Sequence, residues 1–168
     1  MIEIDIEWRK LQELAVKEFN DLQNIPGIYF VRWSKNGKPE PVPRLRGVDK
    51  QGLLYIGRAK KLKMRVKQLW NGINRKGRHT IGKTIIFSKI FELICLDEFE
   101  IAWKETESHE EAIGQEWTAI HEYSKKHKEP PPLNLSLRNE MFAILGLAKL
   151  GRSLLTYRPN EFVKSIIS

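Results

Sequence analysis

Residues 53–65 read LLYIGRAKKLKMR, and this stretch predicts a strand followed by a basic helix. A short apolar run that ends at Gly57 is typical of a strand. The next eight positions contain five cations, and the apolar residues among them recur with helical spacing. We therefore predict a strand over 53–57 and a helix over 60–71. Neither element requires Tyr55 or Arg65, so these two residues need another explanation.

Residues 28–33, IYFVRW, predict a second strand because aromatic and β-branched residues dominate the segment. The connection between the two strands, residues 34–52, is rich in proline, glycine and charged residues and is predicted to be a loop. It is too long for a tight hairpin. We therefore expect an antiparallel pair of strands joined by an expanded loop that contacts a ligand.

Hydrophobic periodicity and turn residues predict the remaining elements. A third strand is expected over 99–104, and Ser108 and Glu111 form a capping-box pattern that opens a helix reaching about Ser124. The other predicted helices span 7–23, 85–94, 139–150 and 159–167. Together they predict an α/β (α+β) fold with a small three-stranded antiparallel sheet flanked by helices. The chain is expected to form a single domain, with a core over 25–135, an N-terminal helix in 1–24 and a C-terminal helical extension over 136–168.

The composition is that of a globular protein, with 41% hydrophobic and 10% aromatic residues. The single cysteine, Cys95, excludes a disulfide framework, and its apolar neighbours predict a buried thiol. The acidic N-terminus does not resemble a signal peptide, and no stretch of 18 apolar residues occurs. We therefore expect a cytoplasmic protein that does not enter a membrane.

Positive charge is concentrated in one part of the chain. The formal net charge is +8, but residues 32–89 hold 17 Lys and Arg against only Glu40 and Asp49, while the other residues hold 12 basic and 19 acidic side chains. Nucleic acid is the commonest partner of such a basic region. A basic surface without a partner is the alternative. An anionic membrane is disfavoured because no long basic amphipathic helix is evident.

Two charged residues lie at the margins of predicted buried stripes. On the helix over 60–71, Val66 lies within about 40° of Leu62, whereas Arg65 lies about 60° from it. On the helix that follows Ser108, Glu116 lies one turn from two isoleucines of the apolar stripe. A charge at the edge of a core loses hydration unless a counter-charge or a metal compensates it. The two residues either pair with each other or belong to a functional site.

Two tripeptides give these residues a context. Gly27-Ile28-Tyr29 and Tyr55-Ile56-Gly57 together resemble the motif that defines the GIY-YIG nuclease family. Further residues match positions that the family uses for catalysis or metal binding: Arg65, ten residues after the second tyrosine, and then His79, Glu116 and Asn134. The resemblance covers residues 25–135, about two thirds of the chain. Six features in the family's order are considerably more specific than one tripeptide.

The chain also departs from the family's pattern. The gap between the tripeptides is longer than in compact members and is similar to that of the family's restriction enzymes. One turn after Arg65, where the family often has His or Tyr, this chain has Leu69, which favours a form that has lost cleavage. Three residues after Tyr55 it has Arg58, where several members have Lys.

The resemblance implies a metal-dependent endonuclease that hydrolyses DNA phosphodiester bonds. Glu116 would hold one Mg²⁺ or Mn²⁺ ion, and Arg65 would bind two phosphate oxygens. Tyr29 or Tyr55 would be the general base, with the other orienting water or phosphate. His79 would relay a proton or contact phosphate.

A tyrosine base has to overcome an unfavourable pKa. At neutral pH only about 0.1% of a tyrosine with a reference pKa near 10 is phenolate. Lowering this pKa by roughly three units takes about 4 kcal/mol. We expect this stabilisation from Arg58, the lysines near it and the metal.

Phosphate contacts that are sensitive to salt and mostly independent of DNA sequence are expected from the basic segments. The candidate residues are Arg44, Arg46, Arg58, Lys60, Lys61, Lys63, Lys67, Arg75, Lys76 and Arg78. The main alternative is a nucleic-acid-binding module that has kept the fold but lost cleavage. A third interpretation is a basic structural protein whose weak affinity for DNA does not depend on Arg65. Neither the biological role nor the oligomeric state follows from the sequence.

Overall fold

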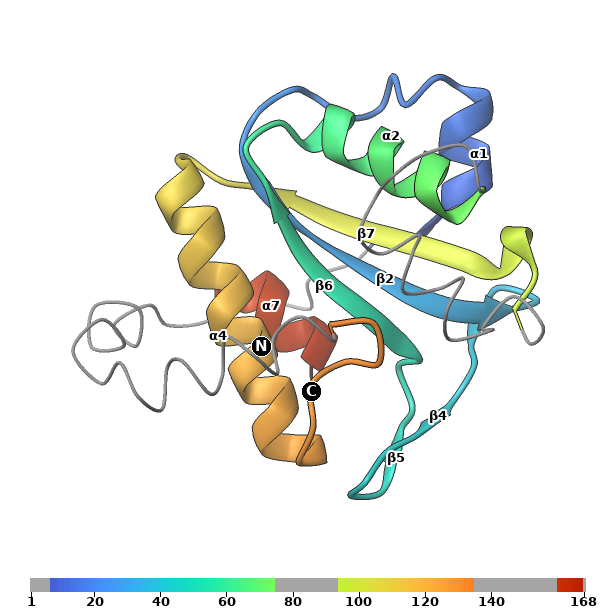
Figure 1. Ribbon diagram of the computed structural model, residues 1–168, viewed down its shortest axis with the longest axis vertical. Helices are drawn as coiled ribbons and strands as arrows, with labels where there is room; N and C mark the ends of the chain where they lie inside the picture. Colours follow the sequence, from blue (N-terminus) through green and yellow to red (C-terminus); the bar gives the residue numbers. More distant parts are fainter. Residues whose placement is uncertain (1–6, 75–93, 135–159, 168) are drawn as a thin grey trace.

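The computed structural model describes residues 7–74, 94–134 and 160–167. Its centre is an antiparallel sheet in which β2 (Gly27–Lys35) lies between β6 (Leu53–Ala59) and β7 (Phe99–Glu105) (Figure 1). The α+β class and the three main strands of the sheet are as predicted. Two short strands extend this sheet: β1 (Arg9–Lys10) beside β7 and β3 (Lys38–Pro39) beside the end of β2.

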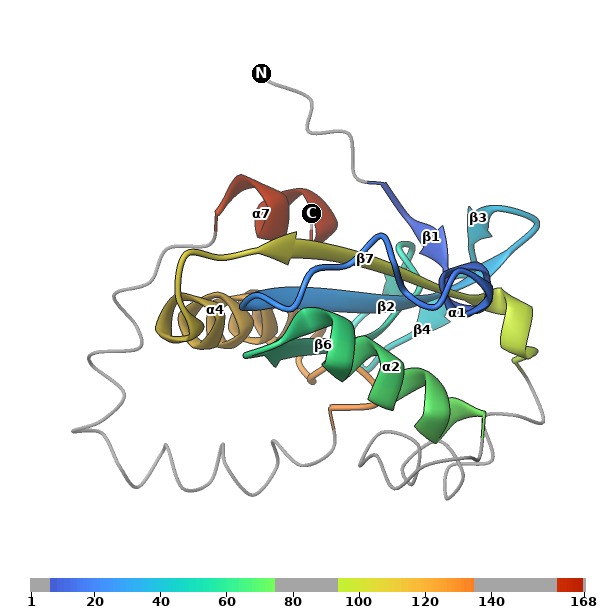
Figure 2. The same cartoon turned by 90° about the horizontal axis from the view of Figure 1, so that it is seen from above.

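Helices cover both faces of the sheet, and Figure 2 shows α2 and α7 on opposite sides of it. Tyr29 and Val31 of β2 pack in the core formed with α1 and α2, whereas Ile28 and Phe30 pack in the core formed with α4 and α7. Successive side chains of a strand point to opposite faces, so one strand serves both cores. The bounds of these helices are Leu11–Val16 (α1), Leu62–Ile73 (α2), His109–His127 (α4) and Glu161–Ile167 (α7).

Gly27, the glycine of the GIY tripeptide, permits close packing of α2 on the sheet. A Cβ atom at Gly27 would overlap the Leu62 side chain and lie 2.5 Å from the Lys104 carbonyl oxygen. Helix α2 was predicted to stop at Asn71-Gly72 but continues to Ile73. Ile73 is only 1% exposed, and burying it contributes about 2 kcal/mol. This outweighs the roughly 1 kcal/mol that a glycine costs in a helix.

The N-terminal helix is much shorter than the predicted span of 7–23. Helix α1 ends at Val16, because Glu18 and Phe19 adopt positive φ angles of 52° and 58° that no α-helix accommodates. Phe19 and Leu22 are nevertheless buried in the same core as residues of α1. The spacing of apolar residues therefore predicted correctly that these side chains are buried, but it overestimated the length of the N-terminal helix.

Helix α4 begins as predicted. The Ser108 hydroxyl accepts a hydrogen bond from the Glu111 backbone N–H at 3.0 Å. The Glu111 carboxylate accepts a hydrogen bond from the N–H of Glu107, whereas a capping box would use the N–H of Ser108. The helix runs to His127, past the predicted end, and Lys128 terminates it in the left-handed conformation with φ 63°.

Other predictions have mixed outcomes. The predicted helix over 139–150 and that over 85–94, apart from Ile94, lie outside the described residues. Helix α7 lies within the last predicted helix, 159–167. Cys95 is exposed, so the prediction of a buried thiol is wrong: it directly precedes the short surface 3-10 helix Leu96–Glu98. Every helix in the described ranges is too short or too polar to span a lipid bilayer.

Candidate active site

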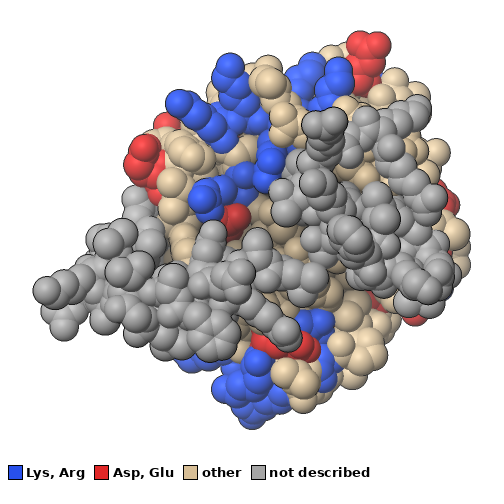
Figure 3. Space-filling view, in the orientation of Figure 1, with Lys and Arg blue, Asp and Glu red and all other residues tan. Residues whose placement is uncertain are grey.

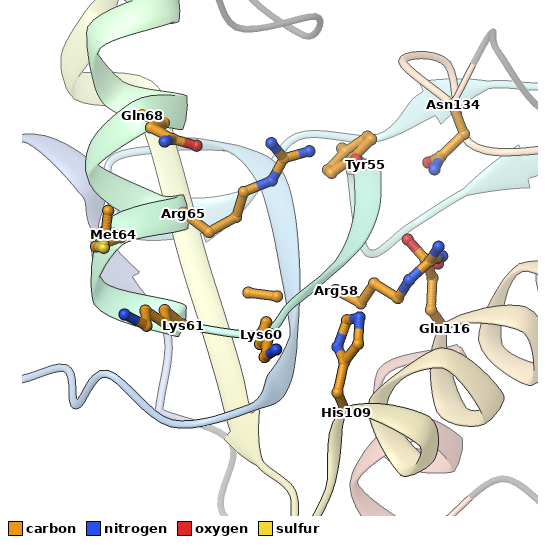
Figure 4. Close-up of a pocket in the computed structure, with 11 residues that line it drawn as sticks. Tyr55, Arg58, Lys60, Lys61, Met64, Arg65, Gln68, His109, Glu116 and Asn134 are labelled. Atoms are coloured by element: carbon orange, nitrogen blue, oxygen red, sulfur yellow. The ribbon is translucent and has the colours of Figure 1, made fainter.

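A surface pocket of about 550 Å³ lies where α2 and α4 approach β6 from opposite faces of the sheet (Figure 4). Within the described chain, β6 pairs with one strand, β2, and its other edge faces the pocket and the segment that ends at Asn134. The lining residues are Tyr55, Arg58, Ala59, Lys60, Lys61, Met64, Arg65, Gln68, His109, Glu116 and Asn134. Four of the six residues assigned by resemblance to the nuclease family are among them.

The two motif tyrosines pack against each other on the α2 side of the sheet. Tyr29 is opposite Gly57 and Tyr55 is opposite Val31, so the rings are diagonal neighbours with centroids 5.8 Å apart. A Cβ atom at Gly57 would lie 2.5 Å from the Tyr55 ring and 2.7 Å from Cζ of Tyr29. The YIG glycine therefore makes room for both rings. Only Tyr55 lines the pocket, whereas Tyr29 is 0% exposed.

Arg65 projects from α2 toward Tyr55 (Figure 4). It is half-buried, while Val66 and Leu69 of the same helix are fully buried, which confirms its predicted place at the edge of the stripe. Burial lowers the pKa of Arg65, but the adjacent phenols of Tyr29 and Tyr55 outweigh burial and leave this pKa raised. The guanidinium is therefore a permanent positive charge in the pocket.

The pKa values of both tyrosines move in the direction opposite to that expected for a base. Burial raises the pKa of Tyr29 well above 10, and the neighbouring Tyr55 raises it further. Burial also raises the pKa of Tyr55, with an added contribution from the negative charge of Glu116. Arg65 lowers both pKa values but does not offset burial. Arg58, one of the expected sources of stabilisation, pairs with Glu116 instead. With both pKa values raised above 10, the two side chains are neutral phenols at neutral pH.

Glu116 reaches the pocket from α4 and forms an ion pair with Arg58 of β6. Its side chain is 11% exposed, and that of Arg58 is 39% exposed. The alternation of β6 explains this partner, because Arg58 points to the α4 side of the sheet while Arg65 lies on the α2 side. The cation that compensates Glu116 is therefore Arg58, and the considered pairing of Arg65 with Glu116 is replaced by this one.

Asn134 binds the backbone of β6 at the centre of the YIG tripeptide. Its Oδ1 accepts a hydrogen bond from the Ile56 N–H at 3.0 Å, and its Nδ2 donates one to the Ile56 carbonyl at 2.8 Å. The Leu133 N–H adds a bond to the Leu54 carbonyl at 2.9 Å. The segment after the proline run thus completes the outer edge of β6. Asn134 lines the pocket, but both ends of its amide bind the strand.

His109 lines the pocket and was not identified from the sequence, where it was treated as part of the helix cap. It is the first residue of α4, and Figure 4 shows its ring pointing toward the Arg58 side chain. Its Nδ1 atom is buried and has no hydrogen-bond partner among the described residues. The signal that could have found it is spacing, since His109 precedes Glu116 by two helical turns and so lies on the same face.

The predicted phosphate-binding cations divide into separate groups. Arg58, Lys60 and Lys61 line the pocket, and Lys67 is exposed on α2. Lys63 instead donates a hydrogen bond to Asn20 at 2.9 Å. Basic side chains gather over α2 in the face shown in Figure 3. Arg44 and Arg46 do not line the pocket. Four assigned residues lie outside the described ranges: Arg75, Lys76, Arg78 and His79.

Leu69 stands where the nuclease family often has His or Tyr, and this difference favoured an interpretation without cleavage. Packing in the core explains why a leucine occupies this position. Leu69 is 0% exposed and packs with Leu62 and Val66 under α2. Its neighbour Gln68 lines the pocket instead. A histidine or tyrosine at position 69 would therefore be directed into the core of this protein and away from the pocket.

The donor set of the pocket limits which metal it suits. Glu116 is the only carboxylate among the lining residues, and no cluster of three or more His, Cys, Asp or Glu occurs within the described parts of the chain. A single carboxylate fits Mg²⁺ or Mn²⁺, which retain most of their waters and take further oxygens from a substrate phosphate.

No protein-family model, curated protein or solved structure matches this chain.

Proposed function

We propose that this protein is a metal-dependent DNA endonuclease of the GIY-YIG type. One observation carries the proposal: Tyr55, Arg65, Glu116 and Asn134 come from four separate segments and line one pocket. They bring a phenol, a guanidinium and a carboxylate to one surface hollow. The +8 net charge and the lysines at the rim support an anionic substrate.

A phosphodiester in this pocket would meet complementary groups on opposite walls. Arg65 can donate two hydrogen bonds to non-bridging oxygens and stabilise the charge that develops in the transition state. Glu116 would hold Mg²⁺ or Mn²⁺, which supplies further neutralisation of the phosphoryl group. Arg58 would then leave Glu116 and, with Lys60 and Lys61, contact phosphates beside the scissile bond.

Tyr55 is the motif tyrosine that can touch a bound substrate or water, because it lines the pocket and Tyr29 is buried beneath. As a neutral phenol it would donate a hydrogen bond, and it would accept a proton only after losing its own. His109 is the other candidate for contact with the attacking water, because it lines the pocket and its Nδ1 atom has no hydrogen-bond partner among the described residues. Tyr29 would then position Tyr55 by packing.

Cleavage of supercoiled plasmid in Mg²⁺ or Mn²⁺ tests the proposal, with duplex binding measured separately without metal. Arg65→Ala should reduce cleavage by about 10²–10³-fold. Glu116→Gln should abolish cleavage but retain binding, and Glu122→Gln on the same helix is the matched control. His109→Ala should slow cleavage, whereas His121→Ala, which alters an exposed histidine of the same helix, should not.

The alternative function, a nucleic-acid-binding module without cleavage, is favoured by the ion pair on Glu116 and by the raised pKa values of both tyrosines. It predicts that the wild type binds duplex DNA without nicking it and that Glu116→Gln behaves identically. A basic structural protein would bind DNA weakly, and Arg65→Ala would leave that affinity unchanged.

A further inference from the structure

A short ribbon extends beyond the end of the central sheet (Figure 1). Strands β4 (Val42–Pro43) and β5 (Val48–Asp49) pair antiparallel within the segment predicted as a loop, 34–52. The Arg44 N–H donates to the Gly47 carbonyl at 3.1 Å and closes the tip. Leu45 at this tip is 78% exposed, and Arg46 beside it is also exposed. Val48 of β5 is also 50% exposed, so the ribbon presents two apolar side chains to solvent beside Arg46.

The tip is held in place by the last residue of α4 and by the residues that follow it. The Glu129 carboxylate accepts a hydrogen bond from the Leu45 N–H at 2.7 Å and forms an ion pair with Arg44 at 3.0 Å. Arg44 also donates to the Pro130 carbonyl at 2.5 Å, and the Arg46 N–H donates to the His127 carbonyl at 3.2 Å. Arg44 therefore acts inside the protein, and it leaves Leu45 and Arg46 at a fixed position facing solvent.

The base of the ribbon is fixed as well. Asp49 is buried and accepts hydrogen bonds from the Tyr123 hydroxyl at 3.0 Å and from the backbone N–H groups of Gln51 and Leu53, both at 2.9 Å. These bonds tie β5 to both α4 and β6. Because the ribbon is ordered before it meets a partner, a contact through its tip would cost little conformational entropy.

The surroundings of the tip are basic. Exposed cations in the ribbon or next to it are Arg46, Lys50 and Lys128, and the nearby Glu129 is paired with Arg44. Figure 3 shows Lys and Arg gathered at this end of the molecule and again over α2, on the same face. A two-stranded ribbon is narrow enough to enter a groove of duplex DNA. Its cations would then meet phosphates, and its apolar tip would meet sugars or base edges.

We propose that the β4–β5 tip is a second duplex contact, in which Arg46 binds a phosphate and Leu45 packs in a groove outside the pocket. This inference rests on the proposed function, because it takes duplex DNA as the partner. It adds that the bound duplex extends along one face from α2 to the ribbon. The ribbon would thus set the register of the DNA relative to the scissile phosphate.

Footprinting and affinity measurements on a mixed-sequence duplex, without metal, test this contact. Arg46→Ala should weaken binding roughly fivefold and lower the slope of log affinity against log salt by about 1. Leu45→Ala should weaken binding with no change in that slope. Both variants should lose protection at one end of the footprint and keep it around the pocket. Lys17→Ala and Val16→Ala, which alter an exposed cation and an exposed apolar residue at the end of α1, are the controls.

The outcomes separate this inference from the proposed function. Wild-type affinity and a full-length footprint for both tip variants would overturn the ribbon contact and leave the nuclease proposal standing. A tip variant that changes the oligomeric state in sedimentation would assign the tip to a second copy of the chain and also overturn the inference. A wild type that fails to bind duplex at any salt concentration would overturn both.

Discussion

Replacement of Asn134 by alanine tests whether this residue acts on the strand or on the substrate. The variant loses both hydrogen bonds to Ile56 and leaves a backbone N–H and a carbonyl of β6 unpaired. Each orphaned buried group costs about 1–3 kcal/mol. Asn134 is 4% exposed but lines the pocket, so water can partly replace its amide. We therefore expect a loss of about 2–4 kcal/mol in the free energy of unfolding.

Urea unfolding followed by tryptophan fluorescence and circular dichroism measures this loss. Total stability of a domain is about 5–15 kcal/mol, so the variant should still fold, with a transition at lower urea concentration and an unchanged slope. Asn20→Ala is the matched control, because the Asn20 amide accepts a single exposed hydrogen bond from Lys63. Its loss should be below about 1 kcal/mol.

Cleavage by the same variants completes the test. If Asn134 positions β6, then Asn134→Ala should lose stability and cleavage together, since Tyr55 directly precedes the released Ile56 and Arg58 follows two residues later. A variant as stable as the wild type that no longer cuts DNA would refute this reasoning. Asn134 would then act directly on the substrate, and the bonds to Ile56 would be incidental.

A metal ion is expected to compete with Arg58 for the Glu116 carboxylate. Arg58→Gln should therefore tighten Mn²⁺ binding several-fold in titration calorimetry. An unchanged affinity for Mn²⁺ would show that the metal ion and Arg58 do not share this carboxylate. The pKa of Tyr55 is raised above its ordinary value of 10.0. If the mechanism needs the Tyr55 phenolate, the cleavage rate should therefore rise about tenfold per pH unit until the pH reaches this raised pKa. A rate that is constant around neutral pH, or the same slope in Tyr55→Phe, would assign the base elsewhere. Gly57→Ala should destabilise the protein by about 1–3 kcal/mol, because the added methyl group overpacks the two tyrosine rings. In urea unfolding this loss should exceed that of the control Gly37→Ala. A methyl group at position 37 meets no atom within 4 Å, so that variant bears only the strain of a φ of 73°.

Elements with strong local signals were predictable from the sequence. The aromatic and β-branched runs identified β2, β6 and β7 because such residues favour a pleated, buried surface. Ser108 identified the start of α4 because an N-cap bond joins residues only three apart. By contrast, the end of α1 depends on two residues with positive φ that let Phe19 and Leu22 reach the core. No local preference indicates such a turn.

The sequence by itself determined which residue types are candidates for chemistry: the two tyrosines, Arg65, Glu116 and Asn134 stand out by motif, spacing or an unexplained charge. Only the tertiary structure decided how these residues are buried and paired. It buries Tyr29, exposes Tyr55 to the pocket and pairs Glu116 with Arg58. The reason is that these relations depend on which face of the sheet each helix covers. That choice follows from packing of both cores at once, which local sequence does not encode.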